Sequence, residues 1–198
     1  LADGGNGAQA YADAVGVYLA FAADKGADYW SSLCSWHSSG EKMRNTFGRQ
    51  ALPMIWDYAE CCPFSTSTGN WMACVDWVWK SIHRSVCPVD GTAVQLDATA
   101  AINGVESPLI STDPPYYDNI GYADLSDFFY VWLRRSLRDV FPDLFSTLLV
   151  PKAQELVATP YRFDGSRNKA ERFFEQGLSK AFEHMKQTHS PEYPLTVY

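Results

Sequence analysis

The chain has 198 residues, enough for one substantial domain or for one domain with a small extension. Hydrophobic residues make up 46% of it and aromatic residues 15%, so a packed core is easily supplied. The sequence contains neither an apolar run of eighteen residues nor a basic-then-apolar leader, which excludes a membrane-spanning helix and a secretory signal from this stretch. The net charge of −7 does not by itself favour a nucleic-acid-binding protein.

The charge is unevenly distributed along the chain. Residues 1–133 hold 6 basic and 15 acidic side chains, whereas residues 134–198 hold 10 basic and 8 acidic ones. A surface that faces phosphate is therefore expected in the second part, with an ordinary solvated helix surface as the alternative. Five cysteines without a CxxC pair predict buried thiols in a reducing cytoplasm, and neither a disulfide framework nor a zinc site.

Three helices are expected in the first half of the chain. Helical spacing of apolar residues predicts them over residues 9–33, 41–50 and 71–86, with Asn70 as the cap of the third. The apolar face of this third helix is expected to lie in the core, although a base-stacking platform or a surface covered by further chain are alternatives. Its members are Trp71, Val75, Val78, Trp79 and Ile82. Residues 1–88 are thus predicted to form a helical, Trp-rich segment.

The second half alternates between short strands and helices. Strands are predicted over residues 93–96, 107–112 and 194–198, and helices over residues 125–140 and 169–187. This order is typical of an α/β protein with a doubly wound sheet, so residues 89–198 are predicted to form a second domain. Ligands bind such sheets beyond the carboxyl ends of the strands, where Asp97 and Asp113 fall.

The most informative motif is Asp113-Pro114-Pro115-Tyr116, directly after a predicted strand. The exocyclic amine of adenine is a poor nucleophile, and methylating it requires acceptors that orient its two N–H bonds. Asp113 offers a carboxylate and Pro114 a main-chain carbonyl, while the two prolines make the turn rigid. A fixed carboxylate also stabilises the positive charge that develops on the amine. Tyr116 offers an aromatic face to a base that has left the duplex.

This motif and the long stretch around it, residues 111–135, resemble the adenine-specific DNA methylases of the long microbial type that often carry a zinc ribbon. Residues 54–60 and 191–198 are also similar to that family. The resemblance implies a Rossmann-like methyltransferase sheet, S-adenosylmethionine as cofactor and DNA as partner. It implies target-amine and base-stacking roles for Asp113, Pro114, Pro115 and Tyr116, and a contact between Asp97 and the cofactor.

One part of the family pattern is missing from the sequence. The glycine-rich cofactor loop of the family has no counterpart, because no strand precedes Gly4-Gly5-Asn6-Gly7. The opening Leu1 and the strand-like ending also suggest a piece of a longer protein, whose remainder would be a further partner. We therefore expect a partial methyltransferase core that is inactive by itself.

Several alternatives stay open at this stage. The acceptor could be the amine of cytosine or a base in RNA, or the chain could be a non-catalytic interaction module with a decayed motif, or a structural subunit. A metal cluster of Asp118, Asp124 and Asp127 is conceivable, but turn and helix-cap carboxylates are the expected reading, so no metal is predicted. Arg134, Arg135 and Arg138 could meet phosphate or simply form a solvated helix face.

Overall fold

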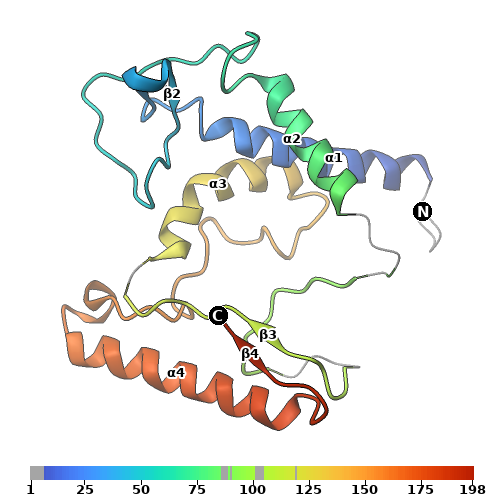
Figure 1. Ribbon diagram of the computed structural model, residues 1–198, viewed down its shortest axis with the longest axis vertical. Coiled ribbons are helices and arrows are strands. Elements are labelled where there is room, and N and C mark those ends of the chain that lie inside the picture. Colours follow the sequence, from blue (N-terminus) through green and yellow to red (C-terminus); the bar gives the residue numbers. More distant parts are fainter. Residues whose placement is uncertain (1–6, 86–88, 90, 101–104, 119) are drawn as a thin grey trace. The chain divides into compact units, whose positions relative to one another are not determined.

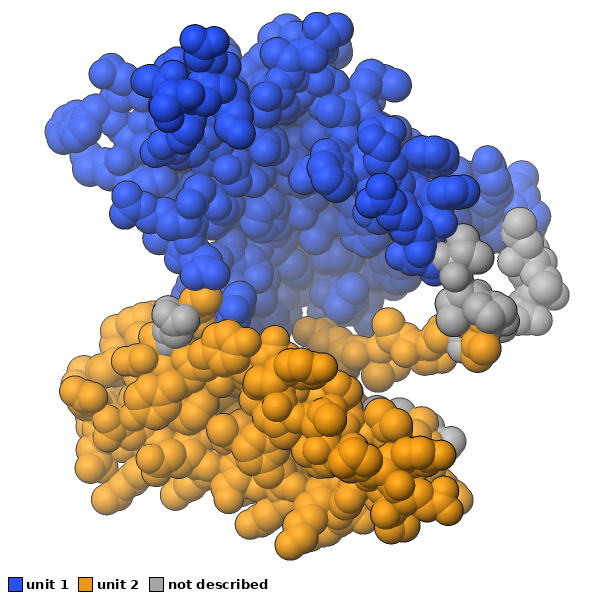
Figure 2. All heavy atoms as spheres, in the orientation of Figure 1, with its two compact units in different colours: residues 1–88, 122–152 blue, residues 89–121, 153–198 orange. Residues whose placement is uncertain are grey.

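The structure is a computed structural model that describes residues 7–85, 89, 91–100, 105–118 and 120–198. This part of the chain is mixed α/β, with four α-helices and two two-stranded sheets (Figure 1). Contacts divide the chain into two compact units, which Figure 2 colours separately. Unit 1 comprises Leu1–Pro88 and Tyr122–Lys152, and unit 2 comprises Val89–Gly121 and Ala153–Tyr198.

This division differs in one respect from the predicted domains 1–88 and 89–198. The boundary after residue 88 coincides with a junction between units, but residues 122–152 group with unit 1. The reason is helix packing: α3 (Tyr122–Leu137) lies against α1 (Ala8–Ala27), and Ala20, Tyr130, Leu137 and Phe145 form their shared core. An earlier helix thus covers part of the apolar stripe of α3, while Trp132 stays 43% exposed. The predicted pair of domains itself stays a prediction.

Helix α1 ends earlier than the predicted residue 33. Asp28 caps it, and the Asp28 carboxylate then accepts hydrogen bonds from Asn45 Nδ2 at 2.7 Å and from the Phe47 N–H at 3.0 Å. Trp30 folds back over Gly26, where a Cβ atom would lie 2.3 Å from the indole ring. The Asp28 carbonyl, which could have accepted a further helical hydrogen bond, instead accepts one from the Thr46 N–H at 2.8 Å in a distant loop.

The helix predicted over residues 41–50 is wrong. The chain instead forms an antiparallel pair of β1 (Ser35–His37) and β2 (Lys42–Arg44), joined by the short 3₁₀ turn η1 (Ser38–Gly40). Glu41 takes a left-handed conformation with φ of 46°, which reverses the chain. Met43 becomes buried with Cys34 and Cys61, so a contact that is distant in sequence decides the structure of this segment.

Helix α2 (Trp71–Arg84) matches its prediction closely. The side chain of Asn70 accepts a hydrogen bond from the Ala73 N–H at 2.8 Å, which confirms the predicted cap. The core expected for its aromatic face is not observed, because Trp79 is 56% exposed and Ile82 is 40% exposed. Only Cys74 is buried on this helix. Helix α1 therefore covers a narrower strip of α2 than the apolar pattern predicts.

Unit 2 combines one long helix with a short parallel strand pair. Strand β3 (Ser111–Thr112) pairs in parallel with β4 (Thr196–Val197), as Ser111 opposite Thr196 and Thr112 opposite Val197. Helix α4 (Arg167–Thr188) follows the 3₁₀ turn η2 (Pro160–Phe163), and Figure 1 shows it in orange. Its buried side chains are Ala170, Phe174 and Ala181. Parallel pairing is the arrangement that a doubly wound sheet requires.

The predicted strands are longer than the observed ones. Ser107 has a φ of 49°, and Pro108 has no N–H to offer a sheet, so β3 begins only at Ser111. Residues 93–96 form no strand, and Val94 and Leu96 are exposed. Among the described residues no strand pairs with residues 93–96, so their β-forming side chains do not produce a strand. Cys87, Pro88, Asp90 and Asn119 lie outside the described residues.

Candidate functional site

The predicted motif forms an exposed turn immediately after β3, which we name the lip (residues 113–116). Asp113, Pro115 and Tyr116 are exposed, and Pro114 is half-buried. The preceding strand is held by the Tyr198 N–H, which donates to the Thr112 carbonyl at 2.9 Å. The lip therefore begins where the parallel pair ends, with its polar groups at the surface of unit 2.

A hydrogen bond links the two ends of the lip. The Tyr116 hydroxyl donates to Asp113 Oδ1 at 2.8 Å. The aromatic ring and the carboxylate are therefore oriented with respect to each other before any ligand binds. A base lying on this ring would have its edge close to the carboxylate, which is the pairing that amine recognition needs.

Tyr117, just after the lip, anchors it to α4. Its backbone φ of 48° is a left-handed value that residues other than glycine seldom adopt. Its carbonyl accepts a hydrogen bond from the Ala158 N–H at 2.9 Å. Its ring meets the buried Phe174 edge-on, with ring centroids 5.2 Å apart and planes at 81°. This anchor was missed in the sequence, where the Tyr116-Tyr117 doublet was its only signal.

Charged groups on α4 complete this anchor. Arg167 Nε donates to Glu171 Oε1 at 2.9 Å. The interaction with Arg167 lowers the pKa of Glu171 most, and that with Tyr117 lowers it further. Loss of solvent around the Tyr117 phenol raises its pKa, and the hydrogen bond to Glu171 raises it further. Tyr117, Glu171 and Arg167 thus form one connected polar chain beside the lip.

Asp97, the predicted cofactor contact, lies in a turn of its own. Its Oδ1 accepts hydrogen bonds from the Thr99 N–H at 2.7 Å and from the Thr99 hydroxyl at 2.6 Å. These two bonds lower the pKa of Asp97. The side chain is exposed and follows an irregular segment. The structure thus gives Asp97 a local structural partner, and its cofactor role stays a prediction.

Two of the other charged candidates, Asp127 and Arg134, have structural partners. Asp127 Oδ1 accepts the Val150 N–H at 2.9 Å, and its Oδ2 pairs with Lys152 Nζ at 2.6 Å. Arg134 Nε donates to the Phe145 carbonyl at 3.2 Å, so this arginine supports a loop of unit 1. Over the described residues, no three His, Cys, Asp or Glu side chains are grouped so that they could hold a metal ion.

A half-buried carboxylate in unit 1 was not singled out in the sequence. Asp24 of α1 has its Oδ1 shielded from solvent, with no hydrogen-bond partner among the described residues. Burial raises the pKa of Asp24 from its ordinary 3.8 to about 7. It lines a cavity of about 330 Å³ with Lys25, Asp28, Phe21 and Phe129. The apolar spacing of α1 gave no sign of this environment.

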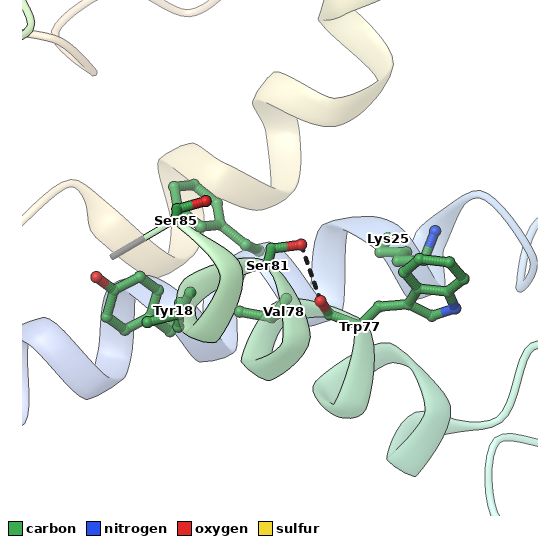
Figure 3. Close-up of a pocket in the computed structure, with 8 residues that line it drawn as sticks. Tyr18, Lys25, Trp77, Val78, Ser81 and Ser85 are labelled. Carbon is green, nitrogen blue, oxygen red and sulfur yellow. Dashed lines mark hydrogen bonds between the residues drawn. The ribbon is translucent and has the colours of Figure 1, made fainter. Parts of the chain in front are cut away.

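A larger cavity of about 550 Å³ lies between α1 and α2 within unit 1 (Figure 3). Tyr18 and Lys25 line it from α1, and Trp77 and Val78 line it from α2. Lys25 Nζ lies 5.4 Å from the centroid of the Trp77 ring, a cation–π distance. This cavity contains no residue of the lip, and its walls are mostly apolar, with Lys25, Ser81 and Ser85 among the polar members.

Comparisons with known proteins give no relative. No protein-family model matches the chain, and no curated protein or solved structure is significantly similar to it. Within the described residues, no helix is long and apolar enough to cross a membrane, as the sequence predicts.

Proposed function

We propose that this chain supplies the target-amine side of an S-adenosylmethionine-dependent DNA methyltransferase that acts on adenine N6. The single observation that carries the proposal is the lip, an exposed carboxylate bonded at 2.8 Å to an exposed tyrosine directly after a parallel strand. The resemblance of residues 111–135, which include the lip, also supports it. The proposal includes a partial Rossmann-like sheet, of which β3 and β4 would be members.

The chemistry of the lip follows from its groups. Asp113 and the Pro114 carbonyl each accept a hydrogen bond from one of the two N–H groups of the amine. These bonds turn the lone pair of the amine nitrogen out of the ring plane, toward the methyl donor. S-adenosylmethionine, when bound, would supply its sulfonium methyl group and leave as the neutral thioether. The carboxylate and the carbonyl dipole stabilise the positive charge on the amine nitrogen until that nitrogen loses a proton to solvent. Pro114 and Pro115 keep the turn rigid, and Tyr116 stacks on the base after it has left the duplex. The target must be flipped out, because the lip cannot reach an amine inside a helix.

The described residues do not by themselves fit a cofactor site. Asp97 is exposed, its Oδ1 is occupied by Thr99, and residues 91–96 before it are irregular. S-adenosylmethionine is proposed from the family resemblance, with its glycine-rich loop supplied by the remainder of a longer protein and Asp97 as a further contact. DNA and that remainder are the proposed partners, and the cytoplasm is the proposed location.

Two other functions make distinct predictions. Since the lip recognises an exocyclic amine, cytosine N4 or a base in RNA is the nearest alternative acceptor. The exposed Trp77 and Trp79 of α2 favour a second reading, a non-catalytic module that binds a partner through this face.

The deciding experiment uses the natural protein that contains this chain, incubated with labelled S-adenosylmethionine and either DNA or RNA. Mass spectrometry of the released nucleosides is expected to show N6-methyladenine from DNA, and none from the Asp113→Ala variant. N4-methylcytosine or methylated RNA nucleosides would move the proposal to those acceptors. Binding of S-adenosylmethionine without any methylated product would favour the interaction module.

A further inference from the structure

The lip owes its shape to the residue that follows it. Tyr117 is held at a φ of 48°, a conformation that only surrounding contacts can maintain in a non-glycine residue. Two contacts do so: the Ala158 N–H on its carbonyl and Phe174 against its ring. Both partners belong to the later part of unit 2, so the end of the lip is fixed from outside its own turn.

The left-handed residue separates two adjacent tyrosines. The Tyr116 hydroxyl bonds back to Asp113 at 2.8 Å, whereas the Tyr117 ring packs against α4. The left-handed backbone at Tyr117 lets the Tyr116 hydroxyl turn back to Asp113 while the Tyr117 ring packs against Phe174 of α4. The direction of Tyr116 is thus coupled to the seat of Tyr117.

The seat on α4 is well defined. Phe174 is only 6% exposed, so its ring is fixed by the core of unit 2. The ring contact with Phe174 and the hydrogen bond from the Ala158 N–H to the Tyr117 carbonyl therefore fix Tyr117 at two points.

We propose that Tyr117 is the positioning residue of the lip, and that its contacts with Phe174 and with the Ala158 N–H set the direction in which Asp113 and Tyr116 face the target amine. This inference rests on the proposed function. It assigns Tyr117 no contact with substrate. The Tyr117 ring contributes more to holding the lip than the Tyr117 hydroxyl does, because the ring makes the contact with the buried Phe174.

The test compares variants at position 117 in the natural protein that contains this chain. Tyr117→Gly keeps the left-handed backbone but removes the ring, and it is expected to lower kcat about 100-fold, as a misplacement of about 1 Å does, with KM for S-adenosylmethionine within about twofold. Tyr117→Phe keeps the ring and is expected to stay within about threefold of wild type. Tyr193→Ala, an exposed tyrosine of the same unit, is the control and is expected to change neither constant.

Hydrogen exchange provides a readout that does not need activity. The peptide that contains residues 113–118 is expected to exchange at least about tenfold faster in Tyr117→Gly and at the wild-type rate in Tyr193→Ala. If Tyr117→Gly fails to fold, Phe174→Leu replaces it, with an expected loss of about tenfold in kcat and the same faster exchange.

The two ideas fail in different ways. Unchanged exchange in the lip of Tyr117→Gly, or unchanged kcat together with faster exchange, overturns the positioning role. Methyl transfer that survives Asp113→Ala, or no methyl transfer by the wild type, overturns the proposed function instead. In the latter case the exchange result still decides whether Tyr117 holds the lip in place.

Discussion

Two carboxylates, Asp113 in unit 2 and Asp24 in unit 1, have opposite environments. Asp113 is exposed and bonded to the Tyr116 hydroxyl, whereas Asp24 is half-buried with one oxygen that lacks a partner among the described residues. A strongly raised pKa, such as that of Asp24, is often taken as the sign of an active site. Amine methylation needs an acceptor that is accessible to the target and oriented toward it, and Asp113 is exposed and oriented by its hydrogen bond to Tyr116. The comparison therefore favours Asp113 for chemistry and assigns Asp24 to stability.

Removing the aromatic half of the lip is expected to lower activity less than the loss of Asp113 itself, but more than any change at Asp97. Tyr116→Ala should lower kcat/KM for DNA about 10- to 100-fold, because stacking of one base contributes about 1–3 kcal/mol. Tyr116→Phe keeps the ring and loses the hydrogen bond to Asp113, so a smaller loss of about threefold is expected. Steady-state kinetics at saturating cofactor measures both, and equal losses in the two variants would show that stacking contributes nothing.

A variant at Asp97 tests whether a second carboxylate in unit 2 contributes to activity by binding the cofactor. Under the proposed cofactor contact, Asp97→Ala should raise KM for S-adenosylmethionine roughly five- to tenfold, the worth of one hydrogen bond, while kcat is retained. Thr99→Val disturbs the same turn without removing the carboxylate and serves as the control. A KM equal to that of the wild type would restrict Asp97 to its turn with Thr99.

Asp24 is expected to affect stability rather than activity. Between about pH 4 and pH 7 the folded chain keeps a proton on Asp24 that the unfolded chain has released, so stability falls as the pH rises through that window. Above about pH 7 both states are ionised and this dependence ends. Asp24→Asn should therefore raise the melting temperature at pH 8 by about 2–4 °C, which corresponds to roughly 1 kcal/mol, and should change it little at pH 4.

Asp13→Asn, a change of the same kind on α1, is the control for this stability measurement. Asp13 accepts a hydrogen bond from Gln9 at the helix surface, so its replacement should leave the difference between pH 4 and pH 8 unaltered. A melting temperature of Asp24→Asn that matches wild type at both pH values would contradict the stability role assigned to Asp24.

Local features of the fold could be predicted from the sequence. The Asn70 cap, helix α2 and most of α3 and α4 follow from residues within a few positions of one another. The site of the lip after a strand was also predicted, because the motif and the strand are adjacent in the chain. Such features depend on propensity, spacing and capping, which short windows contain.

Features that depend on distant partners could not be predicted. The segment around Met43 has helical spacing, yet it forms a strand because Cys34 and Cys61 enclose that side chain. Residues 93–96 have a strand-like composition but no partner among the described residues. The seat of Tyr117 on Phe174 joins two segments that no local pattern relates. Helix α2 was predicted correctly, but the burial of its apolar face was not. Trp79 and Ile82 stay exposed because the neighbouring surface is narrower than the apolar face.

The most direct measurement is the kcat for methyl transfer by Asp113→Asn compared with Asp164→Asn in the natural protein that contains this chain. Both variants exchange an exposed carboxylate of unit 2 for an amide, but only Asp113 lies on the lip. The account predicts a loss of about 100- to 1000-fold for Asp113→Asn, with unchanged binding of S-adenosylmethionine, and wild-type activity for Asp164→Asn. Equal activity of the two variants would contradict the assignment of Asp113 to the target amine.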